Sequence, residues 1–111
     1  MRAAVLGSGS WGSALAKVLS DNGHATGLWG RRPELAAAIE ATRENATFLP
    51  GARFSDALRA TSSLAEALDG AELVVAAVPT HGLREVLHAA RDLVPEPVPV
   101  VSATKGIEQE S

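Results

Sequence analysis

Short apolar runs alternate along the chain with longer segments in which apolar residues recur at helical spacing. The apolar runs predict five strands, at residues 2–6, 24–29, 58–60, 73–78 and 98–103. The helical spacing predicts four helices, which include residues 14–19, 33–40, 64–68 and 83–90. Strands that are apolar throughout and alternate with helices predict a parallel sheet covered on both faces, which is a doubly wound α/β fold.

The segments between these elements carry turn signals. Gly23 is placed to end the first helix in a left-handed conformation. Ser63 and Glu66 have the spacing of a capping box, in which each side chain bonds the backbone of the other residue. Residues 45–53 follow neither period and include a Pro-Gly pair, so they predict a loop that carries an exposed Phe48.

Composition narrows the possible classes of protein. A length of 111 residues with a hydrophobic fraction of 46% fits one domain with a core. A net charge of −3 argues against nucleic-acid binding. The chain has no cysteine, which excludes disulfides and thiolate metal sites and suits a cytoplasmic protein. No pair of histidines has metal-ligand spacing. We expect no signal peptide and no membrane span, because every apolar run is too short.

A glycine-rich motif lies between the first predicted strand and the first predicted helix. Gly7, Gly9 and Gly12 form the pattern G-x-G-x-x-G. The first glycine suits a tight turn, the second lets a pyrophosphate approach the backbone, and the third lets the helix pack closely on the strand. Amides at the helix N-terminus then favour a bound anion. The motif in this context predicts a Rossmann-like, dinucleotide-binding fold.

The end of the second predicted strand indicates which dinucleotide is preferred. Folds that prefer NAD carry an acidic residue there, which binds the ribose hydroxyls, whereas an arginine accommodates the 2′-phosphate of NADP. This chain has Arg31 and Arg32 at that place and no acid. The sequence therefore favours NADP over NAD, and the alternative is that the two arginines are solvated surface charge.

Four other residues are candidates for the same site. Trp11, inside the motif, is expected to wall the cofactor cleft or to face a second domain. For Phe48, packing and contact with the cofactor are both open. Pro79 ends the fourth predicted strand, where ligands of α/β sheets bind. Lys105 follows the fifth, and is expected either to hold an anionic substrate or a carbonyl oxygen, or to be a solvated lysine.

These motifs together resemble the bacterial NAD(P)-dependent glycerol-3-phosphate dehydrogenases over the whole chain. The segments that carry the resemblance, in order, are Gly7-Ser-Gly-Ser-Trp-Gly-Ser-Ala-Leu-Ala, Asn22-Gly-His, Leu28-Trp-Gly-Arg, Glu44-Asn45 with Phe48-Leu49-Pro50-Gly51, Ala77-Val78-Pro79 and Thr104-Lys105-Gly106-Ile107-Glu108. The family reduces dihydroxyacetone phosphate to sn-glycerol 3-phosphate with NADPH or NADH, for glycerophospholipid synthesis.

The resemblance implies a role for particular residues. Ser10 and Trp11 would contact the cofactor, and Phe48 would border the same cleft. Arg31 and Arg32 would lie near the adenosine phosphate. Some members have histidine at the position of Arg31. Lys105 would contact both the cofactor and the substrate.

The resemblance also sets an expectation for the domain organisation. Family enzymes continue beyond the fifth strand into a helical second domain, which supplies the general acid/base lysine. We expect residues 1–111 to be an incomplete NAD(P)-binding domain with no catalytic residue and no turnover alone. The full-length enzyme would be a homodimer whose contacts lie largely elsewhere. Two alternatives are a non-catalytic nucleotide-binding or redox-sensing module and another reductase of the β-hydroxyacid dehydrogenase type.

Overall fold

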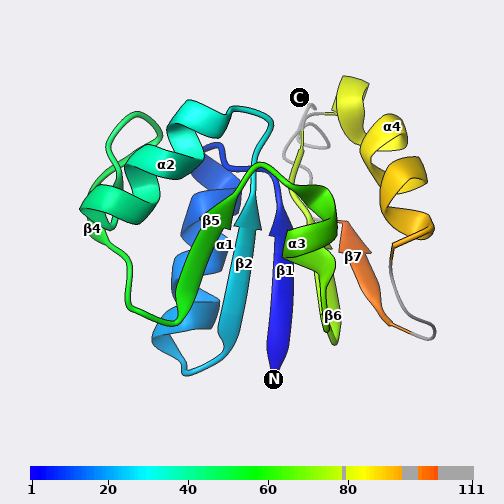
Figure 1. Cartoon of the computed structure of the whole chain (residues 1–111), viewed down its shortest axis with the longest axis horizontal. Helices are drawn as coiled ribbons and strands as arrows, with labels where there is room; N and C mark the ends of the chain where they lie inside the picture. The colour runs from blue at the N-terminus through cyan, green and yellow to red at the C-terminus, as the bar shows by residue number, and fades with distance from the viewer. Residues whose placement is uncertain (79, 94–97, 103–111) are drawn as a thin grey trace.

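The computed structural model describes residues 1–78, 80–93 and 98–102. Its centre is a five-stranded sheet, in which every neighbouring pair of strands is parallel (Figure 1). Across the sheet the order is β5 (Leu58–Thr61), β2 (Ala25–Trp29), β1 (Arg2–Leu6), β6 (Leu73–Ala76) and β7 (Val100–Ser102). The predicted parallel sheet and its five strands are therefore confirmed.

In the described residues, four helices connect the strands and cover both faces of the sheet. They are α1 (Ser10–Asp21), α2 (Pro33–Thr42), α3 (Leu64–Leu68) and α4 (Thr80–Arg91). α1 and α2 contribute Ala16 and Ile39 to one core cluster, and α3 and α4 contribute Leu68 and Val86 to the other. The doubly wound, Rossmann-like arrangement is confirmed. None of the helices in the described part of the chain is both long and apolar enough to cross a membrane.

Alternation along the central strand explains why its sequence is apolar throughout. Val5 belongs to the core cluster under α1 and α2, whereas Leu6 belongs to the cluster under α3 and α4. Both side chains are fully buried. A strand buried on both faces needs an apolar residue at every position, and this requirement produces the unbroken run in the sequence.

The carboxyl ends of the strands lie level with one another. Leu6, the last residue of β1, is paired with Trp29 of β2 and with Ala76 of β6. Trp29 is in turn paired with Thr61, the last residue of β5. The chain runs outward from β1 through β2 to β5 and then returns to the other side of β1. Ligands of open α/β sheets bind where the order reverses in this way, which here is beyond the ends of β1 and β6.

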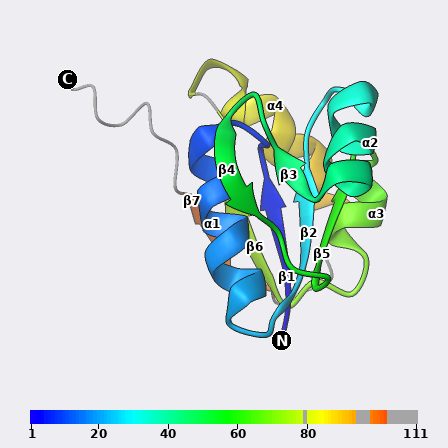
Figure 2. The ribbon, with the colours of Figure 1, turned by 90° about the vertical axis from the view of Figure 1, so that its left-hand side faces the viewer.

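The prediction of a loop at residues 45–53 is wrong. The segment forms an antiparallel hairpin of β3 (Glu44–Asn45) and β4 (Leu49–Arg53), and its pairing contains an irregularity. β3 lies beside α2 and β4 beside α1 (Figure 2). Phe48, in the turn, is half-buried rather than exposed. The hairpin therefore packs on the helices that cover one face of the sheet, with Asn45 buried and Phe48 half-buried.

The capping box is only half formed. The Ser63 hydroxyl accepts a hydrogen bond from the Glu66 N–H at 3.2 Å, as predicted. The Glu66 carboxylate, however, accepts from the Thr61 hydroxyl at 2.5 Å rather than from the Ser63 N–H. The Ser63 N–H donates instead to the Thr61 hydroxyl oxygen at 3.0 Å. The Thr61 hydroxyl, at the end of β5, therefore bonds both the Ser63 N–H and the Glu66 carboxylate, which would bond each other in a complete capping box.

Element ends differ from the predictions by a few residues. β6 ends at Ala76, two residues before the predicted end, and β7 begins at Val100, two residues after the predicted start. Residue 103, the predicted end of this strand, lies outside the described residues. Gly23 has φ +90°, which confirms the left-handed end of α1.

Candidate cofactor site

The first turn after β1 packs tightly against both neighbouring strands. The N–H of Gly7 donates to the Trp29 carbonyl at 2.7 Å, which attaches the turn to the end of β2. Gly7 has φ +123°, and a Cβ there would lie 2.6 Å from the Ala77 carbonyl oxygen, just after β6. Only glycine fits this conformation and this close approach. The turn therefore lies at the place where the strand order reverses.

The other two glycines of the motif differ in what surrounds them. A Cβ on Gly12 would overlap the carbonyl oxygen of Gly7, so Gly12 is needed for α1 to pack against the turn. A Cβ on Gly9 would meet nothing within 4 Å, and the φ of Gly9 is an ordinary −73°. Neither the packing nor the conformation of Gly9 requires glycine. The open space beside Gly9 is where an approaching ligand would lie.

The N-terminus of α1 offers free donors to an anion. Gly9 is the N-cap and has no side chain to accept from the first N–H groups, and the first turn carries no acidic residue. The first N–H groups of a helix have no acceptor within the helix, and they lie at the positive end of its dipole. Ser10 and Trp11 in this turn are exposed, and Trp11 retains 43% of its accessible surface. The arrangement fits the pyrophosphate of a dinucleotide.

Arg31 and Arg32 lie next to this turn. Gly30 packs so closely on Ser8 of the turn that a Cβ would overlap the Ser8 hydroxyl, and the two arginines follow directly. Both arginines are exposed, and Arg32 is the N-cap of α2. A guanidinium nitrogen of Arg31 lies 4.0 Å from a carboxylate oxygen of Glu85 on α4. The structure thus brings two cations to the edge of the glycine turn.

Comparison with known proteins assigns this arrangement to a family. A family model described as the N-terminus of NAD-dependent glycerol-3-phosphate dehydrogenase matches residues 2–111. The chain belongs to this family. A curated glycerol-3-phosphate dehydrogenase of the NAD(P)+ type from Alcanivorax borkumensis is 51% identical over 105 residues, which are 95% of this chain and 31% of that protein.

Solved structures agree with the assignment. A crystal structure of glycerol-3-phosphate dehydrogenase from Coxiella burnetii is similar with a TM-score of 0.89 and 31% identity, over 95% of this chain and 32% of that one. A ketopantoate reductase from Ralstonia eutropha is similar with a TM-score of 0.79 and 27% identity, over 97% of this chain and 35% of that one. The chain therefore spans 31 to 35% of the length of these proteins.

Sequence reasoning missed one residue that contacts the glycine turn from another part of the chain. Asn45 is fully buried, and its side chain donates to the Ser8 carbonyl and to the Ser13 hydroxyl, both at 2.9 Å. Its amide oxygen accepts from the Phe48 N–H at 3.3 Å. Asn45 belongs to one of the segments that carry the family resemblance, but nothing local in the sequence marks it as buried.

Two predicted site residues, Pro79 and Lys105, lie outside the described residues. The other predicted residues belong to the glycine turn, the adjoining end of β2 and the β3–β4 hairpin. A separate cleft of 530 Å³ lies between β2, β5 and α3, and its lining includes Gly27, Arg59 and Glu66. It contains none of the predicted cofactor residues, so it is distinct from this site.

Proposed function

We propose that residues 1–111 bind NADP(H), and less tightly NAD(H), as the cofactor-binding part of a glycerol-3-phosphate dehydrogenase. The observation that carries this proposal is the glycine turn, which places an open, uncapped helix N-terminus at the reversal of the strand order. Membership of the dehydrogenase family supports the choice of a nicotinamide dinucleotide. The reaction is the reduction of dihydroxyacetone phosphate to sn-glycerol 3-phosphate.

Different residues around the turn bind different parts of the cofactor. N–H groups of Gly9, Ser10 and Trp11 bind the pyrophosphate, and the Trp11 ring and Phe48 border the cleft. When bound, the nicotinamide supplies a hydride to the ketone carbon of the substrate. Pro79, which lies outside the described residues, contributes a further cofactor contact in this proposal. Lys105 holds the substrate and polarises its carbonyl oxygen, which gains charge during the transfer.

Charge at the end of β2 favours NADP over NAD. Arg31 and Arg32 offer planar donor groups that suit a phosphate, and the glycine turn is adjacent to them. A 2′-phosphate would gain charge-assisted hydrogen bonds that a 2′-hydroxyl cannot form as strongly. Loss of one such contact weakens binding by roughly 1 to 3 kcal/mol.

An activity assay tests the proposal. It uses the protein purified together with any sequence that follows residue 111 in its reading frame. We expect oxidation of NADPH with dihydroxyacetone phosphate and none with ketopantoate, which separates the two kinds of reductase that share this fold.

Exchange of both Arg31 and Arg32 for Ala should weaken NADPH binding by roughly tenfold or more and leave NADH binding nearly unchanged.

Each alternative predicts a different result. Binding of NADPH without turnover of either substrate would favour a nucleotide-binding module that is not an enzyme. Oxidation with ketopantoate alone would assign the protein to the other reductase class. Equal affinity for NADPH and NADH, unchanged in the double variant, would show that Arg31 and Arg32 are surface charge only.

A further inference from the structure

The carboxamide of Asn45 is held in one orientation by its neighbours. It is completely buried, and both of its N–H donors are used, by the Ser8 carbonyl and by the Ser13 hydroxyl. The reverse orientation would place the amide oxygen against the Ser8 carbonyl oxygen, and neither atom can donate. The Phe48 N–H donates to the amide oxygen and completes the arrangement.

One of these two acceptors, the Ser8 carbonyl, belongs to the peptide between Ser8 and Gly9, inside the glycine turn. The Ser8 carbonyl accepts from Asn45 at 2.9 Å and from the Ser13 hydroxyl at 3.2 Å. A trans peptide places its C=O and the following N–H on opposite sides. Because the carbonyl points toward buried Asn45, the N–H of Gly9 points away from it. Gly9 is also the residue whose Cβ position is open.

We infer that Asn45 is a positioning residue for the pyrophosphate of the cofactor. It fixes the Ser8–Gly9 peptide so that the Gly9 N–H faces the ligand before the ligand arrives. Preorganised donors bind an anion more tightly than donors that must first reorient. The β3–β4 hairpin, which the sequence did not predict, is the element that carries this residue to the turn. The inference rests on the proposed function, because it assumes a dinucleotide at the turn.

Asn45→Asp tests the role with almost no change in side-chain volume. The carboxylate of the variant cannot donate to the Ser8 carbonyl and repels it. We compare binding of NADPH with binding of adenosine 2′-monophosphate, which has the 2′-phosphate but no pyrophosphate. Both titrations are monitored by the fluorescence of Trp11 and Trp29. We expect Asn45→Asp to weaken NADPH binding about tenfold or more and adenosine 2′-monophosphate binding less than about twofold.

A matched control and a second variant complete the design. Asn22→Asp makes the same exchange at the other end of α1, where the exposed amide donates to the Val18 carbonyl at 2.7 Å. It should change neither affinity. Ser13→Ala removes the second donor to the Ser8 carbonyl and should show the same selective loss to a smaller degree. It tests the inference even if Asn45→Asp does not fold.

The outcomes separate this inference from the proposed function. Equal loss of both ligands in the Asn45 and Ser13 variants would overturn the positioning role, since a general disturbance of the fold affects both. Unchanged NADPH affinity in folded variants would also overturn it. If the wild-type protein binds no NADPH, the proposed function itself fails.

Discussion

The three glycines of the motif are glycine for different physical reasons. Gly7 combines a positive φ with a neighbouring carbonyl 2.6 Å from its Cβ position, so the backbone requires it. Gly12 is required by the packing of α1 on the turn. Gly9 has an ordinary φ and free space beside it, so the fold does not require glycine there. The space beside Gly9 is therefore available to a ligand.

Exchange of Gly9 and of Gly7 for Ala should separate binding from folding. Gly9→Ala should keep the free energy of unfolding within about 0.5 kcal/mol, yet lower NADPH affinity, because the methyl group occupies the approach of the pyrophosphate. Gly7→Ala should lower that free energy by more than about 2 kcal/mol. Urea unfolding and NADPH titration measure the two quantities. Undiminished NADPH binding by Gly9→Ala would mean that no ligand uses this space.

Single residues differ in how far the sequence predicts them. The glycines and the two arginines could be predicted because each lies at a fixed offset from a strand end, and strand ends follow from apolar runs. Burial of Asn45 could not, because it depends on a hairpin that folds back onto the turn 37 residues earlier in the chain. A polar residue in a non-periodic segment is ordinarily exposed.

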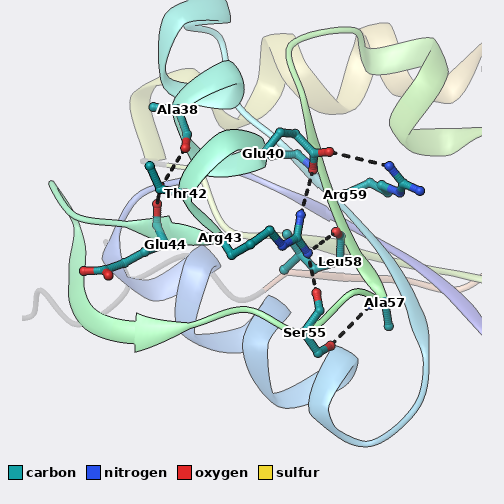
Figure 3. Close-up of polar contacts among 10 residues, drawn as sticks. Ala38, Glu40, Thr42, Arg43, Glu44, Ser55, Ala57, Leu58 and Arg59 are labelled. Carbon is teal, nitrogen blue, oxygen red and sulfur yellow. Dashed lines mark hydrogen bonds and ion pairs between the residues drawn. The ribbon is translucent and has the colours of Figure 1, made fainter.

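At the scale of elements, α2 covers the open edge of the sheet. β5 is the edge strand of this sheet, and no other strand of the described part of the chain pairs with its outer backbone groups. A carboxylate oxygen of Glu40 on α2 accepts from the Ala60 N–H at 2.7 Å. The Arg43 guanidinium, just after α2, donates to the Leu58 carbonyl at 2.7 Å and to the Ser55 carbonyl (Figure 3). These side chains take the place of a further strand and protect the edge from pairing with another chain.

Exchange of Arg43 for Ala should expose this edge. It leaves two partly buried carbonyls without a donor, which should lower the free energy of unfolding by about 2 to 3 kcal/mol. It should also raise the tendency to aggregate, because an uncovered edge strand pairs readily. Thermal unfolding and light scattering measure the two effects.

Arg59→Ala is the matched control for this exchange. Arg43 and Arg59 both pair with Glu40, at 3.4 Å and 3.6 Å, but the Arg59 side chain is 80% exposed. An exposed ion pair contributes little, so the change in unfolding free energy should stay below about 1 kcal/mol. Equal effects of the two variants would show that charge on Glu40, rather than cover of the β5 edge, is what matters.

The elements themselves were predicted where burial dictates the pattern. The inner strands β1 and β6 are apolar runs because both faces of the sheet are covered there, and the helices show one apolar stripe. The hairpin of β3 and β4 escaped prediction because its residues are mostly exposed or half-buried and follow no alternation. Side chains hold it instead, as in the hydrogen bond from the Gly51 N–H to the Glu44 carboxylate at 2.9 Å.

At the scale of the molecule, an ion pair between Arg31 and Glu85 joins the two sides of the sheet. Arg31 follows β2, on one side of β1, and Glu85 lies on α4, which follows β6 on the other side. The pair therefore spans the line where the strand order reverses, beside the glycine turn. If Arg31 binds the 2′-phosphate of NADP as proposed, the Glu85 carboxylate would compete with this phosphate for the guanidinium and would also repel the phosphate.

Exchange of Glu85 for Gln should consequently raise the affinity for NADPH. Arg31 and Glu85 are 61% and 82% exposed, and pairs of this kind contribute at most about 1 kcal/mol, so the gain should be roughly two- to fivefold. NADH affinity should change less, and the gain should shrink at high salt, where exposed charges are screened. On an Arg31→Ala background this gain in NADPH affinity should disappear, because the two residues act through one contact.

Asp56→Asn is the matched control. It alters net charge equally near the start of β5, at the opposite end of the strands, and should have no effect on NADPH affinity. A gain that persists without Arg31, or that Asp56→Asn reproduces, would assign the effect to overall charge and remove Glu85 from the control of cofactor preference.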